Sequence, residues 1–339
     1  MFTTLGLWLW LKATPERHPG RGEHVHVGSW SVAGAQPLSL RYLAAGAACI
    51  AANFGCRPTF ALSALLCFPI FWPQITSLLQ GLKSRSLPPR RALRAPAAVI
   101  IPALIVVLPL MAYNVARFGS PLDFGNDYQM TVTDMTRFVQ PTANFLPSVG
   151  AYLFLPLRFT SEFPFIGMTP IAFREWGYYE LMAGGLFATC PLLLLALAAP
   201  FLRRRMHRSG YWGLATCSLA LAVLLAVFDS HTAGLGWRYI CDFGWMMAIA
   251  ALAPMLYLMH PGGDAIAAGA PDPSERNEPR RDVTKRHPMV LACVRGLVVA
   301  VLMASIILAV LACFIPGRDD SLINNNPVLY DTVVAWFRL

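Results

Sequence analysis

Residues 97–116 read AAVIIPALIVVLPLMAYNVA, an apolar run without a charged side chain. The hydrocarbon core of a bilayer is about 30 Å thick, and about 20 apolar residues cross it as a helix. The run therefore predicts a transmembrane helix. Three further runs have the same character and a sufficient length, at residues 178–201, 240–259 and 291–313. A fifth run, at residues 211–228, is slightly shorter.

The composition of the whole chain agrees with this prediction. Hydrophobic residues make up 56% of the 339 positions and charged residues 13%, whereas soluble domains average about 25% charged residues. A soluble globule of this composition has to expose large apolar patches, which aggregate, and disordered chains are poor in apolar residues. The net charge of +9 does not indicate nucleic-acid binding, because the basic residues lie between the apolar runs. We therefore expect an all-α, polytopic transmembrane helical bundle, with no nucleic acid among its partners.

The predicted number of spans is about seven or eight, because two N-terminal regions can be counted in more than one way. The apolar pieces 42–54 and 59–73 are separated by Gly55-Cys56-Arg57-Pro58, and proline disfavours helix in the residue before it. Two short spans and a hairpin that does not fully cross both fit this pattern. The run from Met1 to Leu11 has about half the length of a crossing. We therefore expect the chain to begin inside a span, as the C-terminal part of a larger membrane protein.

Lys and Arg residues gather on one side of the predicted bundle. The connections 12–41, 81–95, 202–210 and 260–290, together with Arg295, carry 19 of the 27 basic residues but 7 of the 18 acidic ones. Cytoplasmic connections of membrane proteins are enriched in Lys and Arg. These connections are therefore predicted to be cytoplasmic, and the opposite side of the bundle extracytoplasmic.

The predicted organisation has three parts. Residues 1–260 form the transmembrane bundle, including one sizeable extracytoplasmic loop at 118–177 that is rich in aromatic residues and prolines. Residues 261–290 contain glycine, proline and charges of both signs, which predict a flexible cytoplasmic linker. Residues 291–339 supply the last transmembrane helix and a short extracytoplasmic tail. Within the loop, the apolar segment 149–159 is too short to span and predicts an interfacial helix or a re-entrant piece.

The sequence contains no P-loop, HExxH, GxSxG or dinucleotide-binding motif, the patterns by which many soluble enzymes are recognised. The eight cysteines lie in or beside apolar runs and none of them has CxxC spacing. Structural zinc sites depend on such clusters of cysteine and histidine. We therefore expect no metal and no cofactor, and we read the cysteines as small packing residues.

Candidate site residues are the polar side chains at the predicted extracytoplasmic ends of the spans. Charge close to the membrane is costly and often marks function. Arg57 lies at the break between the two short apolar pieces. Its planar guanidinium can bind a phosphate through two hydrogen bonds, or it can extend to lipid headgroups as many membrane arginines do.

A second polar set follows the span at 97–116. Its members are Arg117, Asp123, Asp127, Tyr128 and Gln129. Hydrogen-bond donors and acceptors beside aromatic rings suit sugar hydroxyl groups. A well-capped surface loop explains the same composition, because Gly119-Ser120-Pro121 is a turn signal.

A third set is the stretch WRYICD at residues 237–242. If it begins a helix, Arg238 and Asp242 lie one turn apart on the same face, and Tyr239 is adjacent. A buried carboxylate without a partner is costly, so the spacing predicts an ion pair between Arg238 and Asp242. This pair can take part in ligand binding, or it can be a structural contact that fixes the rotation of the helix.

Three stretches resemble bacterial polytopic glycosyltransferases of the GT-C type, the superfamily of the family 39 and protein mannosyltransferase-like enzymes. Residues 55–59, GCRPT, look like the xRPT break of these enzymes. Residues 113–129, YNVARFGSPLDFGNDYQ, look like their YNxxRFGSPxxFGxxYQ stretch. Residues 238–243, RYICDF, are similar to the RYxxDF start of a late span. All three stretches fall on the side that the charge distribution predicts to be extracytoplasmic.

The resemblance implies a multi-pass enzyme of the bacterial cell (inner or plasma) membrane. Such enzymes transfer a sugar from a polyprenyl-phosphate-linked donor to an extracytoplasmic acceptor, with membrane lipids around them. By the resemblance, Arg57 and Arg238 hold the lipid phosphate, and the segment 117–137 shapes the pocket for the sugar or acceptor. The family's catalytic carboxylate lies in a first extracytoplasmic loop for which this sequence shows no counterpart. The catalytic residue is therefore left unknown.

Two other functions fit the sequence. One is a non-catalytic membrane protein that binds a polyprenyl lipid, or a degenerate relative of the enzymes. The other is a transporter or flippase, although transporters usually carry polar residues near the middle of broken spans and repeated halves. Neither a repeat nor charge in the centres of the long runs is seen here.

Overall fold

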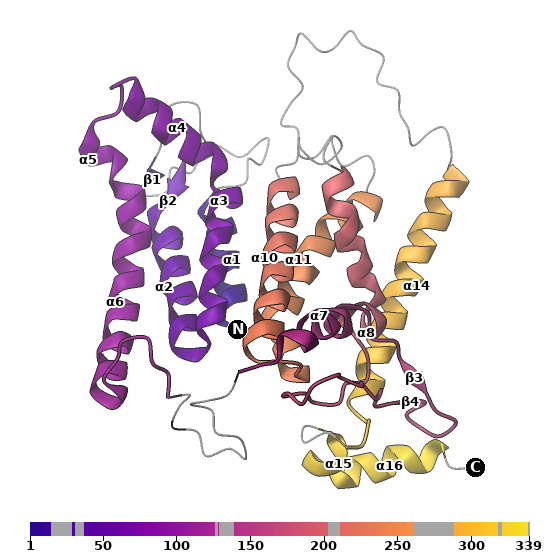
Figure 1. Cartoon of the computed structure of the whole chain (residues 1–339). Helices are drawn as coiled ribbons and strands as arrows, with labels where there is room; N and C mark the ends of the chain where they lie inside the picture. Colours follow the sequence, from indigo (N-terminus) through magenta and orange to yellow (C-terminus); the bar gives the residue numbers. More distant parts are fainter. Residues whose placement is uncertain are drawn as a thin grey trace. The chain divides into compact units, whose positions relative to one another are not determined.

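The computed structural model describes residues 1–14, 29–30, 37–125, 128, 139–202, 211–259, 288–317 and 321–337. It is mostly helical (75%), which confirms the predicted helical class in its coarse form. The chain divides into two compact units, Met1–Phe138 and Val139–Leu339 (Figure 1). The predicted linker 261–290 falls almost entirely outside the described residues.

Unit 1 is built from helices and one short antiparallel ribbon. Its α-helices are α1 (Phe2–Ala13), α2 (Leu40–Cys56), α3 (Cys67–Ile70), α4 (Trp72–Lys83), α5 (Pro89–Ala92) and α6 (Arg94–Phe118). A 3-10 helix, η1 (Pro58–Leu66), precedes α3. The ribbon pairs β1 (Ser29–Trp30) with β2 (Leu38–Ser39).

Small residues allow α1 and α2 to pack closely. A Cβ atom added to Gly46 would lie 2.4 Å from the Trp10 ring, and one added to Gly6 would lie 2.6 Å from Ile50. The Trp10 indole is buried and donates a hydrogen bond to the Leu43 carbonyl oxygen at 3.1 Å. Close approach at small residues is a common way for helices to associate in lipid.

The break at Arg57-Pro58 separates two helices, as the proline predicted. Arg57 has extended backbone angles (φ −156°, ψ 109°), and Pro58 opens η1. The chain then packs η1 back against α2, so the two apolar pieces form a hairpin. After this hairpin the path bends by 66° between the segments Pro58–Ile70 and Trp72–Lys83.

Unit 2 carries the remaining elements. Before the long helices come η3 (Thr142–Asn144), α7 (Phe145–Phe154), the antiparallel strands β3 (Arg158–Phe159) and β4 (Ile166–Gly167), α8 (Leu186–Thr189) and η4 (Pro191–Leu202). The long helices are α10 (Tyr211–Thr232), α11 (Ile240–Met259) and α14 (Pro288–Ala312), with the 3-10 turn η6 (Trp237–Tyr239) before α11. The last elements are α15 (Leu322–Asn325) and α16 (Pro327–Phe337). Residues 149–154 of the segment 149–159, predicted as an interfacial helix or a re-entrant piece, form the second half of α7.

The run 178–201 is not a single helix, in contrast to the prediction. The chain is mostly extended up to Gly185, forms the short α8, breaks at Cys190 and continues as the 3-10 helix η4. Pro191 explains the break, because proline disfavours helix in the residue before it. Gly185 has no side chain, which allows it to lie against the backbone of α7, where its N–H donates to the Leu155 carbonyl oxygen at 2.8 Å.

Four described helices are long and apolar enough to cross a membrane: Arg94–Phe118, Trp212–Thr232, Trp237–Met259 and Ala292–Ala312. The bent pair at 58–83 makes a fifth if it counts as one span. These helices identify a multi-pass membrane protein. The remaining apolar elements, α1, α2 and η4, are shorter.

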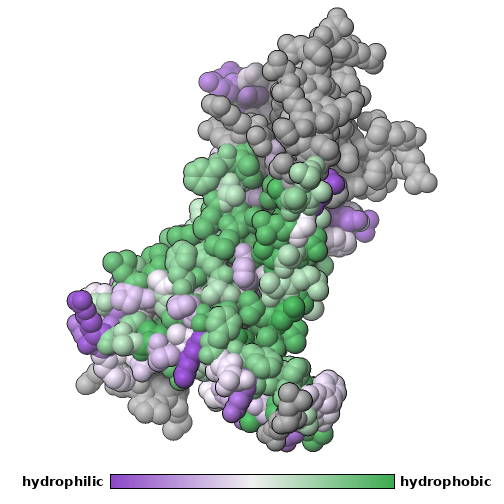
Figure 2. Space-filling view, turned by 90° about the vertical axis from the view of Figure 1, so that its right-hand side faces the viewer, coloured by the Kyte–Doolittle hydropathy of each residue, from purple (hydrophilic) through white to green (hydrophobic). Residues whose placement is uncertain are grey.

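The side chains that these helices expose at the surface of the protein are largely apolar. Residues of high hydropathy cover the middle of the face shown in Figure 2, with polar residues toward its ends. Along α14, the side chains of Leu297, Met303, Ile307 and Val310 are each more than half exposed. Such a surface suits the hydrocarbon core of a bilayer.

A serine of α14 satisfies a backbone group at the start of η4. The Leu192 N–H donates to Ser305 Oγ at 3.1 Å, and Ser305 Oγ donates to the Val301 carbonyl oxygen. A buried N–H that loses its acceptor costs about 1–3 kcal/mol. Ser305→Ala is therefore expected to lower the free energy of unfolding by that amount, measured by thermal unfolding in detergent. Thr332→Ala is the control, because this exposed hydroxyl bonds only within its own helix; an equal loss in both variants would contradict the prediction.

Candidate functional site

The candidate site of unit 2 lies where α7 meets the connection between α10 and α11. In Figure 1 this end of unit 2 also holds β3, β4, α15 and α16. The opposite ends of η4, α10, α11 and α14 join the segments 203–210 and 260–287, which the charge distribution predicts to be cytoplasmic. Within unit 2, the helix ends that lead into these two segments therefore lie opposite to α7.

Tyr152 of α7 holds the connection between α10 and α11 in place. Its side chain is fully buried, with the ring edge-on to Phe243 of α11. Its hydroxyl donates to the Gly234 carbonyl oxygen at 2.8 Å and accepts from the Gly236 N–H at 2.9 Å. Burial raises the pKa of Tyr152 above its ordinary value, because the charged form loses its hydration. The hydroxyl therefore stays protonated and available for both bonds.

A backbone pairing brings a distant segment to the same place. Glu180 N–H donates to the Leu235 carbonyl oxygen at 2.8 Å, and Leu235 N–H donates to the Tyr178 carbonyl oxygen at 3.2 Å. Residues 178–180 therefore run beside residue 235, just before η6. Because η6 contains Arg238 and Tyr239, the pairing places four polar side chains together.

These four residues, Tyr178, Glu180, Arg238 and Tyr239, form what we call the arginine cluster. Arg238 Nη2 donates to the Tyr178 hydroxyl at 3.0 Å, and Arg238 Nε lies 3.6 Å from Glu180 Oε1. The Tyr178 hydroxyl in turn donates to Glu180 Oε1. The guanidinium carbon is 5.4 Å from the ring centre of Tyr239 and 5.9 Å from that of Tyr178.

Gly236 makes the close packing of the cluster possible. A Cβ atom at this position would lie 2.7 Å from the Tyr239 ring and 3.1 Å from Glu180 Oε2. The guanidinium side of the cluster remains open, since the Arg238 side chain is 62% exposed and that of Glu180 is 33% exposed. An arginine held by aromatic rings and still accessible can accept an anionic ligand.

The pKa of Tyr178 is raised above its ordinary value by burial and by the hydrogen bond to Glu180. The folded state therefore holds the phenol proton at pH values where the unfolded chain has released it. Stability from this source is complete below about pH 10 and falls as the pH rises further. Tyr178→Phe is expected to make the fall of unfolding free energy above pH 10 shallower. Alkaline thermal unfolding tests this, with Tyr179→Phe as the control; equal slopes in both variants would contradict it.

The partner of Arg238 differs from the prediction. The guanidinium pairs with Glu180, whereas the helical spacing predicted Asp242. Asp242 is 2% exposed and points into unit 2, while Arg238 lies on its surface. The reason is the 3-10 turn η6, which has three residues per turn and rotates Arg238 away from the face on which an α-helix would place it.

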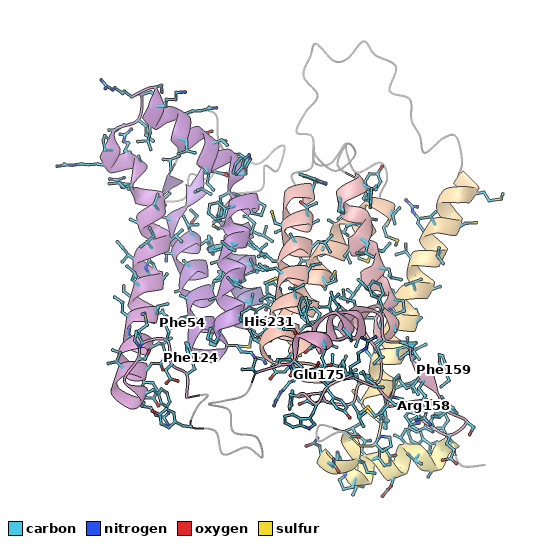
Figure 3. All side chains as sticks on the ribbon, viewed as in Figure 1. Phe54, Phe124, Arg158, Phe159, Glu175 and His231 are labelled. Carbon is cyan, nitrogen blue, oxygen red and sulfur yellow. The ribbon has the colours of Figure 1, made fainter. Side chains whose placement is uncertain are left out.

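In unit 1, the predicted site residues lie at the ends of α2 and α6. The rings of Phe54 and Phe124 meet edge-on at 5.2 Å, which joins the residues after α6 to the end of α2, next to Arg57 (Figure 3). Arg57 is partly exposed in the turn that follows α2. Among the described residues of unit 1, basic side chains at the opposite end include Lys12, Arg41, Lys83, Arg90 and Arg94.

Arg117 and Tyr128 flank an aromatic side chain. The Arg117 guanidinium carbon is 4.9 Å from the ring centre of Phe118, and Arg117 Nη1 donates to the Tyr113 hydroxyl at 2.8 Å. The exposed ring of Tyr128 stacks on Phe118 with the centres 5.3 Å apart. Arg117, Phe118 and Tyr128 therefore lie together at the end of α6.

Asp123 has a structural role in this loop. Its Oδ1 accepts a hydrogen bond from the Gly125 N–H at 2.7 Å, which caps the turn. This is the arrangement that the capped-loop interpretation anticipated. Asp127 and Gln129, the other two predicted residues of this set, lie outside the described residues.

Sequence reasoning missed Tyr178 and Glu180. A charged Glu180 at the start of the apolar run 178–201 was the available signal, but the run was interpreted as a membrane span. Among the described residues, no group of three or more His, Cys, Asp or Glu side chains is placed to hold a metal ion.

Comparisons of the chain with protein-family models, with curated proteins and with solved structures found no match.

Proposed function

We propose that this chain belongs to an integral membrane glycosyltransferase of the GT-C type, and that Arg238 binds the phosphate of its polyprenyl-phosphate-linked sugar donor. The observation that carries the proposal is the arginine cluster: an exposed guanidinium at the start of the apolar helix α11, 5.9 Å from the ring centre of Tyr178 and 5.4 Å from that of Tyr239. A polyprenyl phosphate has its chain in the bilayer and its phosphate at the surface. A cation at the end of a membrane-crossing helix suits that geometry.

The charge that develops on the donor phosphate during transfer also favours Arg238 as its binding residue. The negative charge on the donor phosphate grows as the bond to the sugar breaks, and a fixed cation stabilises that charge most in the transition state. The Tyr178 hydroxyl accepts from Arg238 Nη2 and donates to Glu180 Oε1, so it holds the guanidinium in place for the phosphate. Arg57, Arg117 and Tyr128 of unit 1 are proposed to serve the phosphate and the sugar or acceptor, on the strength of the sequence resemblance.

The finer topology is part of this proposal. We propose about seven or eight crossings, with α1, α2, η1 and η4 adding to the long helices, and with the basic connections on the cytoplasmic side of a bacterial cell membrane. The reason is the excess of Lys and Arg on those connections. Alkaline phosphatase fused within residues 139–177 is expected to be active and green fluorescent protein dark there; the reverse result would overturn the orientation.

The functional test compares three arginine variants in membranes. Arg238→Ala is expected to lower sugar transfer from a radiolabelled polyprenyl-phosphate sugar by about 10- to 100-fold, the effect of losing a charged hydrogen bond of about 1.5–3 kcal/mol. Arg238→Lys keeps the charge and is expected to restore part of the activity. Arg158→Ala removes an exposed arginine from β3 and serves as the control; equal transfer by Arg238→Ala and Arg158→Ala would reject the assignment.

A non-catalytic polyprenyl-lipid-binding protein is the second candidate. The observation that favours it is that Glu180, the carboxylate of the arginine cluster, is already engaged by Arg238 and Tyr178, so its part in the cluster is to hold the guanidinium. This candidate predicts that the wild-type chain binds polyprenyl phosphate in an Arg238-dependent way but transfers no sugar. The two measurements made on the same preparation therefore separate the candidates.

A further inference from the structure

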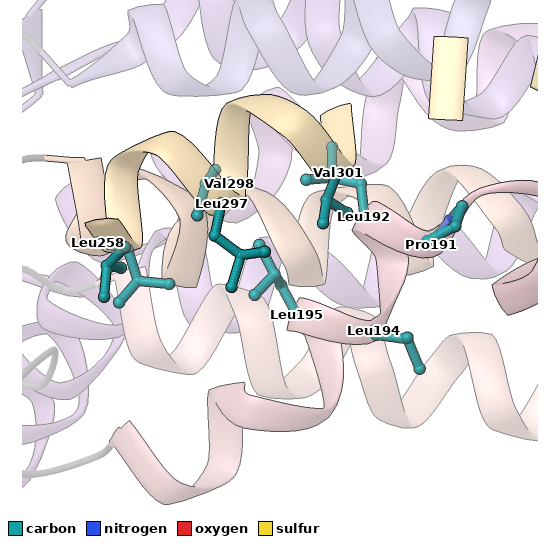
Figure 4. Close-up of a pocket in the computed structure, with 9 residues that line it drawn as sticks. Pro191, Leu192, Leu194, Leu195, Leu258, Leu297, Val298 and Val301 are labelled. Carbon is teal, nitrogen blue, oxygen red and sulfur yellow. The ribbon is translucent and has the colours of Figure 1, made fainter. Parts of the chain in front are cut away.

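A groove runs between η4, α11 and α14, inside unit 2 (Figure 4). Its volume is about 240 Å³. Aliphatic side chains and a proline line it, among them Pro191, Leu192 and Leu195 of η4, Leu258 of α11, and Val298 and Val301 of α14.

The groove follows from the irregular helix at its side. A 3-10 helix has three residues per turn, so its side chains stand in rows that do not interlock well with those of an α-helix. The hydrogen bond from Leu192 N–H to Ser305 Oγ holds η4 against α14 at one end of the groove. Toward the other end, Leu258 lies in the last turn of α11 and Val298 in the early turns of α14. An elongated space remains between these points.

The lining determines what the groove can hold. With only hydrocarbon around it, a polar ligand would lose its hydrogen bonds to water without replacement. The volume lies below the about 300–1,000 Å³ of sites for drug-sized molecules, and it suits a segment of a single hydrocarbon chain. Leu194 and Leu297 at its edge are 47% and 64% exposed, so the groove opens sideways from a helix that crosses the membrane.

Positive charge marks one end of the groove. Arg295, an exposed residue, lies one turn before Val298 on α14. Basic residues at a membrane surface attract anionic lipid headgroups, by about 1 kcal/mol for each residue.

We propose that the groove holds one acyl chain of an anionic phospholipid, whose phosphate lies near Arg295. The lipid comes from the leaflet at the basic end of unit 2, which is the end opposite to the arginine cluster. The site is therefore separate from the proposed donor site, and its test requires no sugar transfer.

The test measures retained lipid on the purified full chain by native mass spectrometry. The detergent-purified protein is incubated with palmitoyl-oleoyl phosphatidylglycerol, with the phosphatidylcholine of the same chains, or with undecaprenyl phosphate. We expect one tightly retained phosphatidylglycerol. Arg295→Gln is expected to reduce its preference over phosphatidylcholine about fivefold, the equivalent of one surface charge.

The second part of the experiment uses variants that fill or block the groove. Val301→Phe is expected to reduce bound phosphatidylglycerol more than about tenfold, since each excluded methylene forfeits about 0.8 kcal/mol. Val299→Phe is the matched control on the same helix, because Val299 is exposed and outside the lining. Leu297→Trp at the exposed edge blocks the entrance without burying extra volume, and it keeps the test informative if Val301→Phe fails to fold.

Two results would overturn the proposal. In the first, Leu297→Trp retains as much phosphatidylglycerol as Val299→Phe, which would place the lipid elsewhere. In the second, undecaprenyl phosphate displaces phosphatidylglycerol at equal concentration, which would make a prenyl chain the occupant.

Discussion

Replacing Gly185 by alanine is expected to prevent unit 2 from folding normally. A Cβ atom at this position would lie 2.6 Å from Leu155 N, 2.7 Å from the Ala151 carbonyl oxygen and 2.7 Å from Phe154 N. All three are backbone atoms at the end of α7, which cannot move aside as a flexible side chain can. Forcing extra volume into a packed site costs about 1–3 kcal/mol and occasionally more, and we expect a loss of at least about 3 kcal/mol here. Size-exclusion chromatography and thermal unfolding in detergent measure it.

Gly150→Ala is the matched control for this variant. Gly150 lies within α7 itself, and a Cβ atom there would meet no other atom within 4 Å. Alanine in a helix is favoured over glycine by about 0.5–1 kcal/mol, so this variant is expected to be slightly more stable than the wild type. Equal thermal unfolding of the Gly150 and Gly185 variants would show that residue 185 does not approach α7 as described.

The long apolar runs were predictable because their signal is local. A stretch such as 97–116 requires no partner to be recognised, since its length and hydropathy alone match the bilayer, and the structure places α6 there. The hairpin break at Arg57-Pro58 was equally local, because proline restricts its own neighbour. In both cases the decisive chemistry lies within a few residues.

The run 178–201 shows where this reasoning fails. Its composition satisfies the same hydropathy criterion, but Gly185 and Pro191 divide it into an extended segment, α8 and η4. The extended part is stabilised by pairing with Leu235, a residue far along the chain. Hydropathy contains no information about that pairing, so the span was predicted as one helix.

The arginine cluster could not be predicted from the sequence for the same reason, because it also depends on a contact between residues far apart in the chain. Arg238 and Tyr239 were identified because they are adjacent to each other at the start of a span. Glu180 joins them only through the backbone pairing of residues 178–180 with residue 235. The predicted partner Asp242 was chosen on α-helical spacing, and the 3-10 geometry of η6 changes that spacing.

Tyr152 connects the fold of unit 2 to the arginine cluster, and Tyr152→Ala is expected to lower the free energy of unfolding by about 4 kcal/mol. The buried ring packs on Phe243, and truncating a buried aromatic residue costs about 3–5 kcal/mol. Gly234 and Gly236 lose their hydrogen-bond partner in addition. Thermal or denaturant unfolding in detergent measures the loss, and Tyr179→Phe again shows the effect of removing an exposed phenol.

Tyr152→Phe separates the two contributions, because it keeps the ring and removes only the hydroxyl. We expect a smaller stability loss of about 2 kcal/mol for the two unpaired backbone groups. Residues 234–236 lead directly into η6, so the same variant is expected to displace Arg238 while unit 2 remains folded. Polyprenyl phosphate binding should then weaken severalfold in Tyr152→Phe at a temperature where the protein is still native, a readout that packing alone does not change. Unaltered binding together with the loss of stability would show that Tyr152 supports the fold without positioning the guanidinium.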